Sequence, residues 1–344
     1  MLFRPGAFAL ALPLLAAVAP PAHAAVGLQH LTIPDPQGAP IEIGVWYPTD
    51  ATPTLKKVEL GPAPLAPNAP VKGSGLPLVV ISHGTGGSFV GHSDTAEALA
   101  EAGFVAAALT HTGDNWRDHS RSAQIWDRPR QLTVLVDYML RAWPAHDQLD
   151  PARIGAFGFS AGGFTVLAAA GGDADFSAVR PHCREHPEAF ECHLVATSKG
   201  SPSAIPALAH DPRIRAIVVA APALGYTFDR RGLAGVRLPV QLWRAENDHV
   251  LQHPYYAEAV RAALPTEPET HVVAGADHYD FLQPCSESLA KWLAARAPEI
   301  CRSAPGFDRT AFHADFDREI VAFFQRTLAP VTAAAASPAD PAKR

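Results

Sequence analysis

The sequence lacks the features that mark nucleic-acid-binding, redox and zinc-ribbon proteins. Its 344 residues include four cysteines and no C-x-x-C pair, which argues against a zinc ribbon or a thiol–disulfide oxidoreductase. Lysine and arginine number 28 against 34 acidic residues, and no basic run occurs, so no nucleic-acid partner is expected. The formal net charge of −6 favours solubility and indicates no particular partner.

Long uninterrupted apolar runs are also missing. The apolar run at residues 6–19 is short and contains proline, follows a basic start at Arg4, and precedes the A-x-A sequence Ala22-His23-Ala24. These features are typical of a secretory signal peptide, so we predict cleavage near Ala24 and removal of residues 1–24. The mature protein is then expected in the periplasm or outside the cell, without a membrane span.

The four cysteines are expected to form two disulfides rather than a metal site, because the chain is predicted to be exported. Three pairings are possible among Cys183, Cys192, Cys285 and Cys301. We favour the local pairing, Cys183–Cys192 with Cys285–Cys301, because each bridge closes a short polar loop that contains proline.

What the sequence does contain is an alternation of short apolar runs and helix-like segments. Strands are expected at 28–33, 41–47, 76–82, 104–109, 213–221, 239–243 and 269–273, and helices at 93–102, 129–143, 255–264, 286–296 and 309–328. The alternation predicts one α/β domain over residues 25–328, with a mostly parallel sheet and helices on both faces. We expect a surface excursion at 48–75, a disulfide-bearing insertion at about 171–212 and a disordered tail at 329–344.

The stretch Gly158-Phe159-Ser160-Ala161-Gly162 fits G-x-S-x-G, the pattern of a nucleophile elbow. It lies between a short buried strand and a helix of small residues, which is the context that this pattern requires. Ser160 is therefore the candidate nucleophile, at a helix N-terminus where free N–H groups favour a developing negative charge. The alternative is a Gly/Ser loop of some other α/β protein.

A nucleophilic serine needs a base, and the base needs an acid to orient it. Behind a G-x-S-x-G elbow these groups follow in the order serine, acid, histidine. Asp248 and His278 each follow a predicted strand, at its carboxyl end, and we predict that they are the acid and the base. The rival acids are Glu246, Asp229, Asp173 and Asp175, and the rival bases are His249 and His271.

The oxyanion formed during acyl transfer needs two N–H donors. One is expected from Ala161, the residue after the nucleophile. The other is expected from the glycine-rich loop 83–87, which follows the strand at 76–82, and Thr85 is the donor that we choose. A phosphate-binding loop is disfavoured because no G-K-[ST] sequence follows, although a loop that only turns the chain remains an alternative.

Together these motifs resemble the dienelactone-hydrolase-like branch of the α/β-hydrolases. The resemblance is carried by Ile81-Ser82-His83-Gly84-Thr85-Gly86-Gly87, the Ser160 elbow, the Asp248 loop and Ala276-Asp277-His278-Tyr279. The sequence Val45-Trp46-Tyr47-Pro48 is also similar to platelet-activating-factor acetylhydrolases and polyester hydrolases. Over residues 28–328 the resemblance implies an α/β-hydrolase fold, ester hydrolysis and a Ser160–Asp248–His278 triad.

The chain departs from both groups in ways that bear on its substrate. Dienelactone hydrolases are cytoplasmic and use a cysteine nucleophile, whereas this chain is predicted to be exported and has a serine. Acetylhydrolases place the acid much sooner after the serine. The substrates of those families therefore do not transfer to this chain, because a fold alone does not fix a substrate.

Several further residues near the same edge of the sheet are candidates for binding. Loop aromatics that could line an acyl pocket are Trp116, Trp126, Tyr226, Phe228 and Tyr279, although ordinary packing at the rim is the alternative. His111 and Asp114 could in principle bind a metal, but hydrogen bonds that shape their loop are the favoured role.

The sequence thus predicts an exported serine hydrolase that cleaves small-molecule or lipid-like carboxylic esters through an acyl-enzyme. No metal ion or organic cofactor is expected. A polyester or phospholipid-acyl hydrolase with the same triad is the second candidate. A non-catalytic binding protein on a hydrolase scaffold is the alternative from another class.

Overall fold

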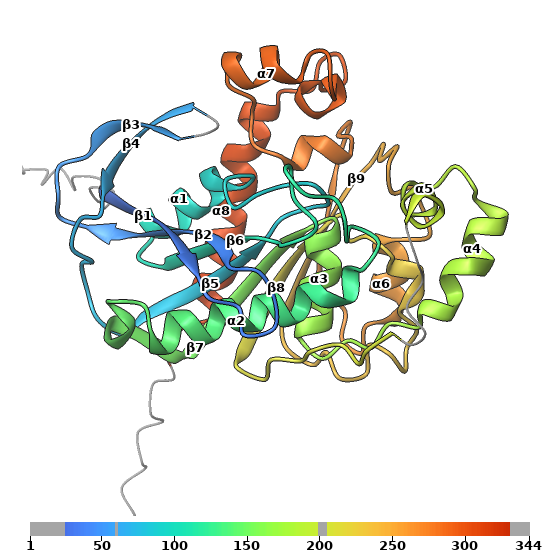
Figure 1. The fold of residues 1–344 in the computed structure, drawn as a ribbon, viewed down its shortest axis with the longest axis horizontal. Coiled ribbons are helices and arrows are strands. Elements are labelled where there is room, and N and C mark those ends of the chain that lie inside the picture. The colour runs from blue at the N-terminus through green and yellow to red at the C-terminus, as the bar shows by residue number, and fades with distance from the viewer. Residues whose placement is uncertain (1–24, 59–60, 199–204, 331–344) are drawn as a thin grey trace, which may run out of the picture.

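The computed structural model describes residues 25–58, 61–198 and 205–330. The predicted signal peptide lies outside this range, and so does the predicted tail from residue 331 onward. The described strands are β1 (Ala25–Ile33), β2 (Ile41–Thr49), β3 (Thr54–Val58), β4 (Gly61–Pro67), β5 (Leu76–Ser82), β6 (Val105–Thr110), β7 (Leu149–Phe159), β8 (Ile214–Ala220), β9 (Val240–Ala245) and β10 (Glu269–Val273). They form one sheet in the order β10-β9-β8-β7-β5-β6-β2-β1-β4-β3 (Figure 1).

The strands from β5 to β10 pair in parallel, and β2 joins this part of the sheet antiparallel to β6. Every residue of β5 and of β6 is buried, as expected for parallel strands that are covered on both faces. Because the parallel strands run in one direction, the loops after β5, β7, β9 and β10 all leave from the same edge of the sheet.

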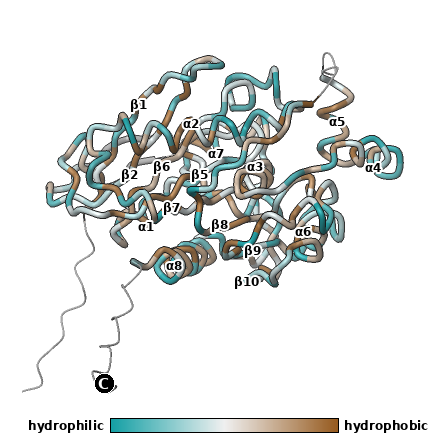
Figure 2. The backbone as a smooth tube through the Cα atoms, turned by 90° about the horizontal axis from the view of Figure 1, so that it is seen from below, coloured by the Kyte–Doolittle hydropathy of each residue, from teal (hydrophilic) through white to brown (hydrophobic). Residues whose placement is uncertain are grey.

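Helices cover both faces, as predicted. The described α-helices are α1 (Ser93–Glu101), α2 (Arg128–Arg141), α3 (Ala161–Ala169), α4 (Val179–Glu185), α5 (Phe190–Thr197), α6 (Ala257–Ala263), α7 (Glu287–Leu293) and α8 (Arg309–Thr327). Leu132 of α2, Phe164 of α3 and Val260 of α6 pack into one core, whereas Leu99 of α1 and Phe316 of α8 pack into the core on the other face. Figure 2 shows the same division, with α1 and α8 on one side of the sheet and α2 and α3 on the other.

The predicted surface excursion at 48–75 instead contains two strands. β4 pairs in parallel with β1 and antiparallel with β3, so the sheet continues beyond β1. Leu65 and Ala66 are buried against this end of the core. No strand was predicted here because β4 contains several prolines, which lack the N–H group that pairing between strands uses.

The insertion contains the helices α4 and α5, at the opposite end of the molecule from β3 and β4 (Figure 1). Both predicted disulfides are present: Cys183–Cys192 joins α4 to α5, with 5.4 Å between the Cα atoms, and Cys285–Cys301 spans the segment that contains α7, with 5.6 Å. Such bonds are compatible with an oxidising compartment. No helix in the described part of the chain combines the length and apolar character that crossing a membrane requires.

Candidate active site

The turn between β7 and α3 places Ser160 in a strained backbone conformation. Its φ is 56° and its ψ is −117°, a region that residues with a side chain rarely adopt. Two backbone hydrogen bonds hold it there, from Ser160 N–H to the Ala220 carbonyl and from Ala223 N–H to the Ser160 carbonyl, each 2.9 Å. The glycines of the motif are needed because a Cβ at Gly158 or Gly162 would overlap neighbouring backbone atoms.

Three loops bring a serine, a histidine and an aspartate into one line of hydrogen bonds. Ser160 Oγ lies 3.1 Å from His278 Nε2, and His278 Nδ1 lies 2.8 Å from Asp248 Oδ2. The side chains of His278 and Asp248 are buried. The three residues follow β7, β10 and β9 respectively, so the shared edge of the parallel sheet accounts for their meeting.

The rival residues lie elsewhere or have other partners. Glu246 accepts a hydrogen bond from Gly275 N–H at 2.8 Å, and Asp229 accepts one from Gly232 N–H at 2.6 Å. His249 is 76% exposed and pairs with Asp277. The remaining rivals have structural contacts: His271 stacks on Trp243, Asp173 lies near His210, and Asp175 caps a short helix at Ser177 N–H.

A cavity of about 350 Å³ opens beside Ser160. Thr85 and Ala161, the two predicted oxyanion donors, line it together with Ser160. Most of the other lining side chains are apolar, and many belong to the insertion: Phe176, Val179, Phe190, Leu194, Val195 and Ile205. A pocket of this size and character accommodates a bulky apolar group next to the serine.

The residues that line this cavity differ from the aromatic lining that the sequence predicted. Of the loop aromatics named from the sequence, Trp126 lines it, but Trp116, Tyr226, Phe228 and Tyr279 do not. Phe228 is buried against Phe164 in the core, and Tyr226 stacks on His182 at 3.8 Å between ring centroids.

Tyr279 lies with its ring edge-on to His278, and Trp116 is 41% exposed beneath the guanidinium of Arg117. The sequence placed these aromatics near the correct edge of the sheet but could not show where each side chain points. It also missed the apolar residues of α4 and α5, because their contacts depend on how the insertion folds back.

His111 and Asp114 form hydrogen bonds that shape their loop, the role favoured from the sequence. Both ring nitrogens of His111 have partners, Ser82 Oγ and Gln131 Oε1, each at 2.8 Å. Burial, together with the charge of Arg128, lowers the pKa of His111 well below its usual value, so the ring is neutral. Asp114 Oδ1 accepts hydrogen bonds from Gly86 N–H and Ser122 Oγ.

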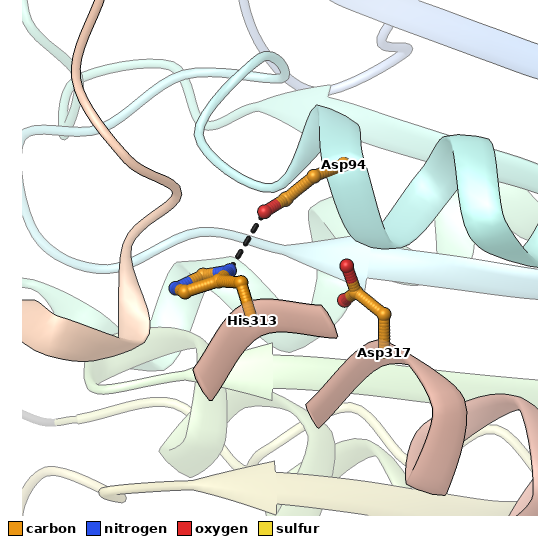
Figure 3. A group of neighbouring side chains, drawn as sticks. All are labelled: Asp94, His313 and Asp317. Carbon is orange, nitrogen blue, oxygen red and sulfur yellow. Dashed lines mark hydrogen bonds and ion pairs between the residues drawn. The ribbon is translucent and has the colours of Figure 1, made fainter. Parts of the chain in front are cut away.

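Among the described residues, Asp94, His313 and Asp317 are the group whose ligating atoms lie close enough together to hold a metal ion (Figure 3). Both ring nitrogens of His313 already have partners, however: Nδ1 lies 2.7 Å from Asp94 Oδ2, and Nε2 lies 2.9 Å from the Asp280 carbonyl. Both partners accept hydrogen bonds, so the ring donates from both nitrogens and carries a positive charge. We therefore interpret this group as an ion-pair network between α1 and α8.

The same network supports the loop of His278, through Asp280, which the sequence did not single out. Asp280 is fully buried, accepts a hydrogen bond from Asp277 N–H at 2.8 Å and pairs with Arg309 at 2.9 Å. It belongs to the short helix η5 (His278–Phe281), which begins at the candidate base. An aspartate two residues after a histidine has no distinctive motif, so its role appears only when Arg309 folds back onto it.

Comparison with known proteins adds evidence about the fold. No protein-family model matches the chain, and no curated protein sequence matches it either. Among solved structures, it is similar to a ferulic acid esterase from Streptomyces cinnamoneus, with a TM-score of 0.60 and 18% sequence identity over 90% of this chain and 92% of that one. At this identity the likeness concerns the fold, and together with the sheet order it shows that the chain has an α/β-hydrolase-like fold.

Proposed function

We propose that the protein is a serine hydrolase that cleaves carboxylic esters. The observation that carries this proposal is the line of hydrogen bonds from Ser160 through His278 to Asp248, beside a largely apolar cavity. A strained serine at the start of a helix, a buried base and a buried acid are the parts that acyl transfer through a covalent intermediate requires.

In this mechanism Ser160 Oγ attacks the ester carbonyl while His278 Nε2 takes the hydroxyl proton. Asp248 holds the Nδ1–H of the ring and stabilises the imidazolium that forms. The N–H groups of Thr85 and Ala161 stabilise the oxyanion. His278 then protonates the leaving alcohol, and a water molecule activated by the same ring hydrolyses the acyl-enzyme.

The lining of the cavity indicates the class of ester. Its apolar side chains favour a bulky acyl group, aromatic or aliphatic. The structural neighbour is a ferulic acid esterase, which is consistent with an aromatic acyl group. Phe190, Val195 and Ile205 line the cavity and are also partly exposed, which favours a polyester or phospholipid-acyl substrate as the second candidate.

The predicted place of action is the periplasm or the outside of the cell. The two disulfides, together with the secretory features of residues 1–24, support export. Sequencing the N-terminus of protein recovered from a periplasmic extract tests this, with Ala25 as the expected first residue.

A fluorophosphonate probe and an ester panel graded by acyl size test the activity. We expect the probe to label Ser160, and Ser160→Ala to lose label and turnover, with a loss on the order of 10⁶ in kcat as for other triad serines. Circular dichroism should show that Ser160→Ala keeps its fold. If purified Ser160→Ala kept most of the activity, the result would contradict this mechanism. If the folded wild-type protein showed neither label nor turnover, the non-catalytic alternative would be favoured.

A further inference from the structure

A buried network of hydrogen bonds holds the loop at residues 83–87, which follows β5. The His83 carbonyl accepts a hydrogen bond from Arg128 Nη2 at 2.6 Å. The Gly84 carbonyl accepts two, from His83 Nδ1 at 2.6 Å and from Gly87 N–H at 3.1 Å. On the far side of Thr85, Gly86 N–H donates to Asp114 Oδ1 at 3.1 Å.

These bonds set the direction of the Thr85 N–H group. The Gly84 carbonyl and the Thr85 N–H belong to one trans peptide, so they point in opposite directions. Whatever fixes the carbonyl towards His83 therefore fixes the N–H away from it. No acceptor in the described part of the chain takes this N–H, and Thr85 lines the cavity beside Ser160.

The ring of His83 has one defined tautomer. Its Nε2 accepts a hydrogen bond from His111 N–H at 3.0 Å, so Nδ1 carries the proton that is donated to the Gly84 carbonyl. Burial, followed by the positive charge of Arg128, lowers the pKa of His83 well below its usual value. The ring thus stays neutral and keeps this donor.

Arg128, the first residue of α2, is only 2% exposed. Its Nε and Nη1 are buried without a hydrogen-bond partner, and Nε lies 3.7 Å from Asp114 Oδ2. Burying a guanidinium is costly unless it is paired, and the partners of Arg128, Asp114 and the His83 carbonyl, hold its charge beside this loop.

We propose that Arg128 is a positioning residue for the oxyanion site. Its guanidinium donates to the His83 carbonyl at 2.6 Å, and the His83 ring in turn donates from Nδ1 to the Gly84 carbonyl, which belongs to the peptide that carries the Thr85 N–H. Arg128 touches neither substrate nor reacting atoms and acts through His83. This inference rests on the proposed ester hydrolysis.

The first test is Arg128→Met, which keeps the length of the side chain and removes the charge and the donor. A donor displaced by about 1 Å lowers the rate by roughly 10²-fold, so we expect kcat to fall by roughly 10- to 100-fold with KM within about twofold. The matched control is Arg130→Met, the same change two residues further along α2. Arg130 pairs with Asp35 at 2.6 Å, so this variant should lose stability but keep kcat.

The second test separates positioning from stability. Affinity for a boronic acid that forms a tetrahedral adduct with Ser160 should fall in parallel with kcat, because the adduct is anionic and places one of its oxygens at the oxyanion site. Affinity for an intact ester, measured with Ser160→Ala and with Ser160→Ala carrying Arg128→Met, should not change. Arg128→Lys, which keeps the charge, should recover part of kcat relative to Arg128→Met.

Three results would overturn the inference: unchanged kcat in Arg128→Met, a loss confined to KM, or an equal loss in Arg130→Met. If Arg128→Met does not fold, boronate affinity in Arg128→Lys decides, since an unchanged value at reduced kcat contradicts positioning. Failure of the proposed function looks different, because wild-type protein would then show neither fluorophosphonate labelling nor ester turnover.

Discussion

At the residue scale, backbone N–H groups orient the candidate acid as firmly as its partner does. Asp248 Oδ1 accepts hydrogen bonds from the backbone N–H of Val250 at 3.0 Å and of Leu251 at 2.6 Å. The other oxygen, Oδ2, is left to face His278. Because one oxygen is held by the loop, the carboxylate cannot rotate away from the ring, and the ring keeps the proton on Nδ1.

Asp248→Asn tests this assignment. The asparagine oxygen can still accept the two backbone bonds, which places its NH₂ group against His278 Nδ1 and forces the proton onto Nε2. That tautomer cannot accept the proton of Ser160, so kcat should fall by roughly 10⁴-fold with little change in the thermal midpoint. Steady-state kinetics on one ester measures it.

The control for Asp248→Asn is Glu246→Gln, two residues earlier in the same loop. Glu246 Oε2 accepts a bond from Gly275 N–H, which glutamine can also provide, so kcat should change less than about tenfold. A loss in Glu246→Gln as large as that in Asp248→Asn would show that the acid is misassigned.

At the scale of elements, α1 and α8 meet across an excess of carboxylates. Burial, then the charge of Asp94, raises the pKa of Asp317 from its usual 3.8 to about 8, and burial raises that of Glu97 to about 7. Burial opposes the charge on His313, but the hydrogen bond to Asp94 and the negative charge of Asp94, with smaller contributions from Asp317 and the Asp280 carbonyl, together outweigh it and raise the pKa. All three groups therefore bind protons more tightly in the folded chain than in the unfolded one.

A sign for the pH dependence of stability follows. A carboxyl whose pKa is raised by folding stabilises the fold while it is protonated, and this contribution is lost as the pH rises from about 4 towards about 8. The contribution of His313 has the same sign and is lost as the pH rises above its usual pKa of 6.5. The thermal midpoint should therefore decrease as the pH is raised from about 6 to about 9.

Asp317→Asn should reduce that fall, because asparagine keeps the acceptor for Thr95 Oγ1 and cannot ionise. Calorimetric scans over the pH series measure the slope. Asp315→Asn is the control on α8: Asp315 is exposed and pairs with Arg318, so its loss should leave the slope unchanged. An Asp317→Asn slope equal to that of wild type would refute the carboxyl assignment.

At the scale of the whole molecule, the two disulfides lie next to different parts of the candidate site. The insertion with Cys183–Cys192 is distant in sequence from the loops of Asp248 and His278, but Cys183 lines the cavity, and its partner on α5 is followed by Leu194 and Val195, which line it too. Cys301 of the other bridge directly follows Ile300, whose carbonyl accepts a hydrogen bond from Arg309. Arg309 in turn pairs with the buried Asp280. One bridge shapes the cavity wall, and the other lies next to the contacts that support the loop of His278.

Paired Cys→Ser variants should separate these roles. Loss of Cys183–Cys192 should lower kcat/KM for bulky esters more than for acetyl esters, because the cavity wall loosens. Loss of Cys285–Cys301, which closes a 16-residue separation, should lower the free energy of unfolding by up to ~3 kcal/mol and reduce kcat for all esters alike. Chemical denaturation and the ester panel measure both effects, and identical acyl profiles for the two variants would count against this division.

Local patterns in the sequence were enough to predict those parts of this protein whose positions the backbone fixes. Continuous apolar runs such as Leu76–Ser82 predicted buried parallel strands, and the glycines around Ser160 predicted a sharp turn. Asp248 and His278 could be chosen because each follows such a strand, and parallel strands bring their carboxyl ends to one edge. A short-range pattern is enough whenever the backbone alone fixes where a residue goes.

Where a side chain points, and which residues a distant segment covers, became known only from the packing of the folded chain. Phe228 is in the core and Trp126 is in the cavity, although both are loop aromatics near the same edge. Likewise, Arg128 meets His83 only because α2 packs beneath the loop after β5, with 45 residues between the two in sequence. Such contacts follow from the packing of whole elements, and no local pattern in the sequence records them.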